Sequence, residues 1–102
     1  MRVIKPSTIQ KWCDQHPRAK EGLEAWLALV RGAKWQHPPD MLKTFRDADP
    51  EKVKSGRTVY IFNIRHNEYR LICAVHFNLE KVFALRFMNH KEYQKGAWKN
   101  EL

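Results

Sequence analysis

Two segments in the second half of the chain alternate between apolar and other side chains, the pattern of a β-strand with one buried face. The first segment places Leu71, Cys73, Val75 and Phe77 on its apolar face and Arg70, Ile72, Ala74 and His76 on the other. The second segment places Phe83, Leu85 and Phe87 on its apolar face and Ala84, Arg86, Met88 and His90 on the other. Both segments are therefore predicted to be strands that face one core.

The two strands are expected to form an antiparallel hairpin, and a shared core restricts its register. Directly paired residues must then have numbers with an even sum, which requires a connection of odd length. A three-residue loop at 79–81, Leu-Glu-Lys, meets this condition. The resulting pairs include Phe77 with Phe83, Ala74 with Arg86, and Arg70 with His90. The register brings a guanidinium beside an imidazole, although both groups could also be solvated residues on an open sheet face.

The segment 58–65 carries apolar side chains in both sets of alternate positions, which favours a strand buried on both faces. One set consists of Tyr60, Phe62 and Ile64, and the other of Val59 and Ile61. With the first set toward the core, Ile64 pairs with Leu71 and the turn to the next strand falls at Asn67-Glu68. Asn67 tolerates the positive φ of a tight turn.

The N-terminal third predicts a short strand at residues 3–4 and two amphipathic helices. Ser7 or Thr8 is the expected N-cap of the first helix, whose apolar positions are Ile9, Trp12 and Cys13. The second helix has its apolar positions at helical spacing, at Leu23, Trp26, Leu27 and Val30. Gly32 is its expected end. The two helices are predicted to cover one face of the sheet.

Regular periodicity ends between residues 36 and 57, where Pro38, Pro39, Pro50 and Gly56 interrupt any long element. Asp40 is the expected N-cap of one short helical piece, which holds Met41, Leu42 and Phe45. The basic residues that lead into the strand at 58–65 are Lys52, Lys54 and Arg57. They form either an ordinary solvated connection or a basic loop that grips a phosphate backbone at the rim of the site.

Length indicates the number of domains, and charge indicates the kind of partner. A chain of 102 residues forms one domain, because halves of it would be too small to bury a core. The net charge of +8 favours a polyanion, most simply RNA or DNA, although an acidic protein would satisfy the same charge. Both halves of the chain carry a cationic excess, so the partner is expected to meet the folded surface rather than a detachable basic arm.

Several other classes of protein do not fit the sequence. The glycines form no phosphate-binding loop, and the histidines and cysteines lack the spacing of paired metal ligands, so neither a cofactor nor a metal is expected. No serine lies in a nucleophile-elbow pattern. Cys13 and Cys73 occupy apolar positions and are interpreted as buried free thiols. We find no signal peptide and no membrane segment, which predicts a cytoplasmic protein.

The remaining groups suffice for one reaction class. Cleavage of RNA through its own 2′-hydroxyl requires a base for that proton, an acid for the departing 5′-oxygen, and positive charge around the phosphate. The substrate supplies the nucleophile, so a metal is not obligatory. A basic surface with arginines, a histidine and a tyrosine offers what this reaction needs.

The order of elements resembles the RelE/ParE superfamily of bacterial toxins, which implies an α+β fold with two helices packed on an antiparallel sheet. That sheet consists mainly of a three-stranded meander, followed by a short C-terminal helical turn. Three segments carry a narrower resemblance to the HigB branch, namely Tyr60-Ile61-Phe62-Asn63-Ile64, Asn67-Glu68-Tyr69-Arg70-Leu71-Ile72 and Met88-Asn89-His90-Lys91-Glu92-Tyr93. The resemblance covers nearly the whole chain, with its specific part in the second half.

The resemblance implies a type II toxin that cuts messenger RNA in the ribosomal A site and is neutralised by a HigA antitoxin with a helix-turn-helix fold. Arg70 matches the arginine that stabilises the scissile phosphate, and His90 and Tyr93 match the motif for proton transfer and base stacking. Either of the last two could be the base. The expected RNA contacts are Lys52, Lys54, Arg57, Asn67, Arg86 and Lys91. The alternatives are a non-enzymatic gyrase poison of the ParE type and a basic RNA-binding module. Neither a small-molecule ligand nor a membrane is expected as a partner.

Overall fold

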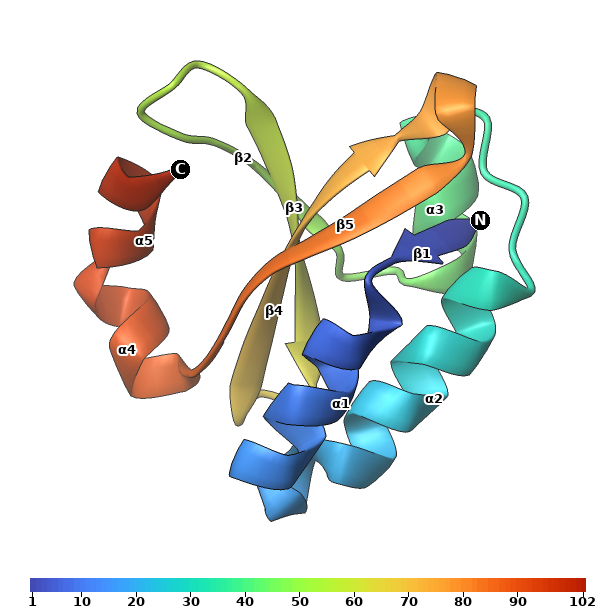
Figure 1. The fold of residues 1–102 in the computed structure, drawn as a ribbon. Coiled ribbons are helices and arrows are strands. Elements are labelled where there is room, and N and C mark those ends of the chain that lie inside the picture. Colours follow the sequence, from blue (N-terminus) through green and yellow to red (C-terminus); the bar gives the residue numbers. More distant parts are fainter.

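A computed structural model describes residues 1–102 as an α+β fold around one five-stranded sheet (Figure 1). The strands lie in the order β1-β5-β4-β3-β2. Their bounds are β1 Arg2–Ile4, β2 Asp49–Lys52, β3 Thr58–Ile64, β4 Tyr69–His76 and β5 Lys81–Asn89. The helices are α1 Pro6–Gln15, α2 Lys20–Arg31, α3 Pro38–Thr44, α4 His90–Lys95 and α5 Ala97–Glu101, with 3₁₀ turns at Pro17–Ala19 and Phe77–Leu79. The fold class predicted from the sequence is confirmed.

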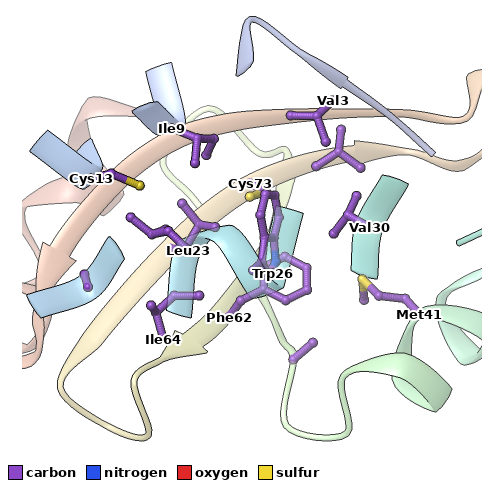
Figure 2. Packing of buried hydrophobic residues seen from close by; sticks show 14 of the residues in the cluster. Val3, Ile9, Cys13, Leu23, Trp26, Val30, Met41, Phe62, Ile64 and Cys73 are labelled. Atoms are coloured by element: carbon purple, nitrogen blue, oxygen red, sulfur yellow. The ribbon is translucent and has the colours of Figure 1, made fainter. Parts of the chain in front are cut away.

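The main core lies between one face of the sheet and helices α1 and α2 (Figures 1 and 2). Trp26 of α2 lies within this cluster and meets the ring of Phe62 edge-on, with 5.6 Å between ring centroids. Cys13 and Cys73 are buried free thiols in the same cluster, as predicted. Every helix is too short or too polar to cross a lipid bilayer.

A second, smaller core lies on the opposite face of the sheet, beneath α4 and α5. Its buried members are Val53, Val59, Ile61, Ile72 and Trp98. Because Phe62 and Ile64 face the main core while Val59 and Ile61 face this one, β3 is buried on both sides, as its apolar pattern predicted. The C-terminal helices therefore form a third layer, and this layer brings α4 toward β4.

The predicted register of the β4–β5 hairpin is wrong. The strands are joined by four residues, because His76 pairs with Lys81 across a 3₁₀ turn that ends at Glu80 with a positive φ of 53°. An even connection reverses the faces of β5 relative to the prediction. A bulge opposite Ile72 and Cys73 adds one residue to β5 and reverses them again, so Arg70 pairs with Met88 rather than with His90.

The even connection also changes which residues of β5 are buried. Val82 packs in the main core, whereas Leu85 packs against the second core instead of the face predicted for it. Phe83 lies beside His76, with 5.2 Å between ring centroids. Beyond the bulge, Phe87 packs against the main core as expected. The alternation rule holds within each half of β5 and fails only across the bulge.

The β3–β4 turn differs from the prediction as well. Ile64 pairs with Tyr69, not with Leu71, and the turn spans four residues instead of Asn67-Glu68. The positive φ values fall on Arg65 and His66, at 51° and 57°. The carboxylate of Glu68 stabilises this turn, because it accepts a hydrogen bond from Arg65 Nε at 3.2 Å and one from Arg18 Nη2 of the helical layer at 3.1 Å.

Three local expectations in the first half of the chain also need correction. Helix α1 begins at Pro6 with Lys5 as its N-cap, so neither Ser7 nor Thr8 caps it. Helix α3 begins after His37, and Asp40 lies one turn inside it, where its carboxylate accepts the backbone N–H groups of Gln36 and His37. The region without periodicity also contains β2, an edge strand. Gly32 ends α2, as predicted.

Candidate active site

Arg70 presents an available positive charge at the start of β4. Its Nη1 donates to the carbonyl oxygens of Asn67 and Tyr69, at 3.1 and 3.2 Å, and these bonds hold the guanidinium near the end of the hairpin. None of the ion pairs in the chain involves Arg70. The guanidinium carbon lies 5.4 Å from the centre of the Tyr93 ring, within the range of a cation–π contact.

Helix α4 delivers His90 and Tyr93 to the same place. Asn89 caps the helix, since its Oδ1 accepts the backbone N–H of Glu92 at 2.8 Å. The backbone N–H of His90 donates to the carbonyl oxygen of Glu68 at 2.9 Å and ties the helix to the β3–β4 turn. His90 and Tyr93 are three residues apart on α4, and their ring centroids are 6.5 Å apart. The Nδ1 atom of His90 is buried and has no hydrogen-bond partner in the protein.

The ring of Tyr93 also stacks on Trp98, with 5.3 Å between centroids and 13° between planes. Trp98 donates its indole N–H to the carbonyl oxygen of Tyr93 at 3.1 Å, so the second core fixes the position of α4. Burial raises the pKa of the Tyr93 hydroxyl, the carboxylates of Glu51 and Asp49 raise it further, and Arg70 lowers it. The hydroxyl is therefore protonated at neutral pH.

Arg70 and Tyr93 line a hollow of about 450 Å³ on this face of the sheet. The other polar residues that line it are Arg46, Asp47, Asp49 and Asn63. Asn63 pairs with Arg70 across the β3–β4 ladder, and its Nδ2 donates to Asp47 Oδ2 at 2.6 Å. The hollow thus has two guanidinium groups, two carboxylates, an amide and a phenol around it.

Three of the predicted RNA contacts lie around this site. Arg86 pairs with Ile72 on the face of Arg70, but its Nε lies 4.0 Å from the carboxylate of Glu101. Asn67 belongs to the β3–β4 turn and contributes its carbonyl oxygen to Arg70. Lys91 is exposed next to His90 on α4. The structure therefore brings Arg70, His90 and Tyr93 together, with Asn67, Arg86 and Lys91 around them.

The predicted basic loop lies elsewhere. Lys52 pairs with Thr58 and shares its face of the sheet with Tyr60, which is the face opposite Arg70. Lys54 and Arg57 lie in the β2–β3 turn, where the backbone N–H of Lys54 donates to the carbonyl oxygen of Lys99 at 3.0 Å. This turn is about 17 Å along β3 from the position that pairs with Arg70. These three cations are not part of the hollow.

Comparison of the sequence with known proteins identifies its family. Residues 19–96 match the family model described as HigB toxin, the RelE-like toxic component of a toxin-antitoxin system. The matched range includes Arg70, His90 and Tyr93. The chain belongs to this family. It is 26% identical over 93 residues to the mRNA interferase toxin HigB of Escherichia coli K12, covering 91% of this chain and 88% of that relative. Proteins named mRNA interferase HigB from Escherichia coli O157:H7 and Shigella flexneri match equally.

The structure adds residues to the site that the sequence analysis did not predict. Sequence reasoning missed Arg46, Asp47 and Asp49, because they precede or begin β2, a strand without a readable pattern. Asn63 was predictable in principle, because it is a polar residue among the apolar positions of β3. Trp98 also supports the site, because it is buried in the second core and anchors α5.

Proposed function

We propose that this protein is a type II toxin acting as a ribosome-dependent endoribonuclease, which cleaves messenger RNA without a metal. The observation that carries the proposal is the meeting of Arg70 from β4 with Tyr93 from α4, beside His90 of the same helix. The names of the relatives as mRNA interferases support an RNA substrate. The net charge of +8 supports a polyanionic one.

Each of the three residues has a role in the proposed reaction. The guanidinium of Arg70, which takes part in no ion pair, stabilises the charge that develops on the phosphate. His90 accepts the proton of the 2′-hydroxyl, whose oxygen then attacks the phosphorus. The bond from phosphorus to the 5′-oxygen breaks, and the protonated hydroxyl of Tyr93 donates its proton to that oxygen. The products are a 2′,3′-cyclic phosphate and a 5′-hydroxyl.

The proposal includes the setting in which the toxin acts. The substrate is messenger RNA in the ribosomal A site of the cytoplasm, and the antagonist is a HigA-type antitoxin with a helix-turn-helix domain. Membership of the toxin-antitoxin family supports the antitoxin as a partner. Cations near the hollow, including Lys91 and Arg86, are available to the RNA backbone on either side of the cut.

Mapping of transcript 5′ ends after brief induction tests the proposal. The wild-type protein is expected to produce new 5′ ends within coding regions, and Arg70→Ala and His90→Ala are each expected to reduce them at least ~100-fold. Arg31→Ala, which removes an exposed cation from the end of α2, serves as the control. Both active-site variants should keep the melting temperature within a few degrees of the wild type.

The same experiment separates the other readings of this fold. A gyrase poison would induce a DNA-damage response with intact transcripts, and a passive RNA-binding module would leave both transcripts and DNA unchanged. Either result for the wild-type protein would contradict the proposal. So would full cleavage by a folded double variant of Arg70 and His90.

A further inference from the structure

The wall of the hollow next to Arg70 presents hydrogen-bond acceptors on Asn63 and Asp47. Asn63 lies between Arg70, its partner in the ladder, and Asp47, to which its Nδ2 donates at 2.6 Å. A carboxylate only accepts hydrogen bonds, so the amide must turn its nitrogen toward Asp47. This leaves Oδ1 of Asn63 and Oδ1 of Asp47 without a donor from the protein, and both can accept a hydrogen bond from a ligand.

The charge of the hollow distinguishes it from the rest of the molecule. The chain as a whole carries +8, yet the hollow has two guanidinium groups, on Arg46 and Arg70, and two carboxylates, on Asp47 and Asp49. These charges balance. A phosphate placed deep in the hollow would meet the carboxylates, whereas a neutral group would not. The hollow, at about 450 Å³, has the size of a small-ligand site.

A nucleobase is the neutral part of RNA, and its polar edge must complement the acceptors of Asn63 and Asp47. Adenine, cytosine and guanine each carry an exocyclic amino group that donates two hydrogen bonds, whereas uracil has no amino group and offers one N–H donor between two carbonyl oxygens. That single N–H could satisfy only one of the two acceptors, and a carbonyl oxygen of uracil would face the other, which is unfavourable once the base covers Asp47 and Asn63. The wall is therefore complementary to an amino-bearing base.

We propose that the hollow holds the nucleobase beside the scissile phosphate, and that Asn63 and Asp47 select an amino-bearing base and reject uracil. This inference rests on the proposed ribonuclease function and adds a specificity determinant to it. Arg46 and Arg70 flank the base and contact phosphates, and Tyr93 provides an aromatic ring at the same hollow. Asp47 acts both on the base and on Asn63, whose amide it orients.

The test is the base composition around each cut, read from transcript 5′ ends after brief induction. For the wild type we expect uracil to be depleted about tenfold at one position next to the cut. Asp47→Asn replaces a charged acceptor by an amide that can also donate, so the depletion should fall below about threefold and uracil should appear at the remaining cuts. Asn63→Ala removes the second acceptor and should act in the same direction.

Controls keep the outcomes distinct. Asp14→Ala removes an exposed carboxylate from α1, on the other side of the sheet, and should leave the profile of cuts unchanged. Asp47→Asn keeps the size of the side chain, so it tests the inference even if Asn63→Ala lowers the melting temperature. Cuts with no depletion of uracil, or an unchanged profile in folded Asp47→Asn, would overturn the inference alone. A wild-type protein that makes no cuts would overturn the proposed function itself.

Discussion

The ring of Tyr93 connects the proposed site with the second core, because it contacts the guanidinium of Arg70 and stacks on Trp98. Burial and the carboxylates of Glu51 and Asp49 keep its hydroxyl protonated by raising its pKa. In the proposed mechanism this one side chain is a proton donor, and in the structure it is also a packing contact. Two substitutions separate these contributions.

Tyr93→Phe keeps the ring and removes the hydroxyl. We expect the melting temperature to change little and the cleavage rate to fall about 100-fold, because the departing 5′-oxygen loses its proton donor. Tyr93→Ala should lower both, since it also removes the stack on Trp98. Cleavage rates on a defined ribosome-bound message, together with thermal melting, measure the two effects. A Tyr93→Phe protein with the wild-type rate would assign the proton transfer to another group.

The thiol of Cys73 provides a pH dependence of stability. Burial raises its pKa well above the ordinary value, whereas the unfolded chain restores an ordinary thiol. The folded state therefore binds the proton more tightly, and this contribution to stability is complete below about pH 8.5 and is lost as the pH rises further. Urea unfolding at pH 7.5 and pH 9.5 should show a smaller loss of stability in Cys73→Ala than in the wild type. Equal losses would show that the thiol does not titrate in this way.

At the residue scale, side-chain chemistry was more predictable than side-chain position. The sequence named Arg70, His90 and Tyr93 from their types and from the family resemblance, and the three lie together. The predicted pairing of Arg70 with His90 was wrong, because the four-residue connection and the bulge in β5 pair Arg70 with Met88, and His90 lies beyond the strand at the start of α4. A helix of six residues is too short to show a helical period in its apolar positions, so the N-cap residue Asn89 was the available signal for the start of α4.

Helix α4 is short, and its position depends on contacts at its first turn. The side chain of Asn89 accepts the N–H of Glu92 at 2.8 Å. Asn89→Ala should lower the free energy of unfolding by about 1 kcal/mol, and cleavage should fall as well because α4 carries His90 and Tyr93. Urea denaturation and transcript mapping provide the two measurements. Asn100→Ala, an exposed position of α5, is the matched control and should change neither.

At the element scale, amphipathic helices and the doubly buried strand were predictable, whereas β2 was not. Residues 49–52 read Asp-Pro-Glu-Lys, without β-branched or aromatic side chains, and form a strand because they extend the sheet beyond β3. Pro50 is tolerated there because β2 is an edge strand. Strand β2 therefore forms through its pairing with β3, which the local sequence does not encode. One wall of the hollow depends on this pairing.

The whole molecule carries its cationic charge over its surface, so binding to RNA should weaken with salt. Binding of a nonspecific RNA, measured by fluorescence anisotropy at several salt concentrations, should show a linear fall of log K with log salt. Arg70→Ala and Arg46→Ala should each reduce the slope by about one, as expected for a lost phosphate contact. An exposed cation far from the hollow, such as Arg31, should leave the slope close to that of the wild type. Affinity independent of salt would contradict an RNA backbone contact.

The packing of α1 and α2 on one face of the sheet could be predicted from the sequence, because apolar faces of helices and strands pack together in few layer arrangements. The third layer, formed by α4 and α5, was not predicted. Trp98 lies in a C-terminal segment of mostly charged and polar residues, and only the second core of β3 and β4 reveals what it packs against. The apolar pattern of β3 already required a cover on both faces, which was the available signal for that layer.

The four-residue connection at 77–80 and the bulge in β5 have a joint consequence for insertions and deletions. Each alone inverts the side on which the remainder of β5 projects, and together they restore it. Deleting one residue from the connection should turn Met88 away from Arg70 and separate α4 from β4. A second deletion, at the bulge, should restore the position of both. Length changes at these two places are therefore expected to be tolerated only as a compensating pair.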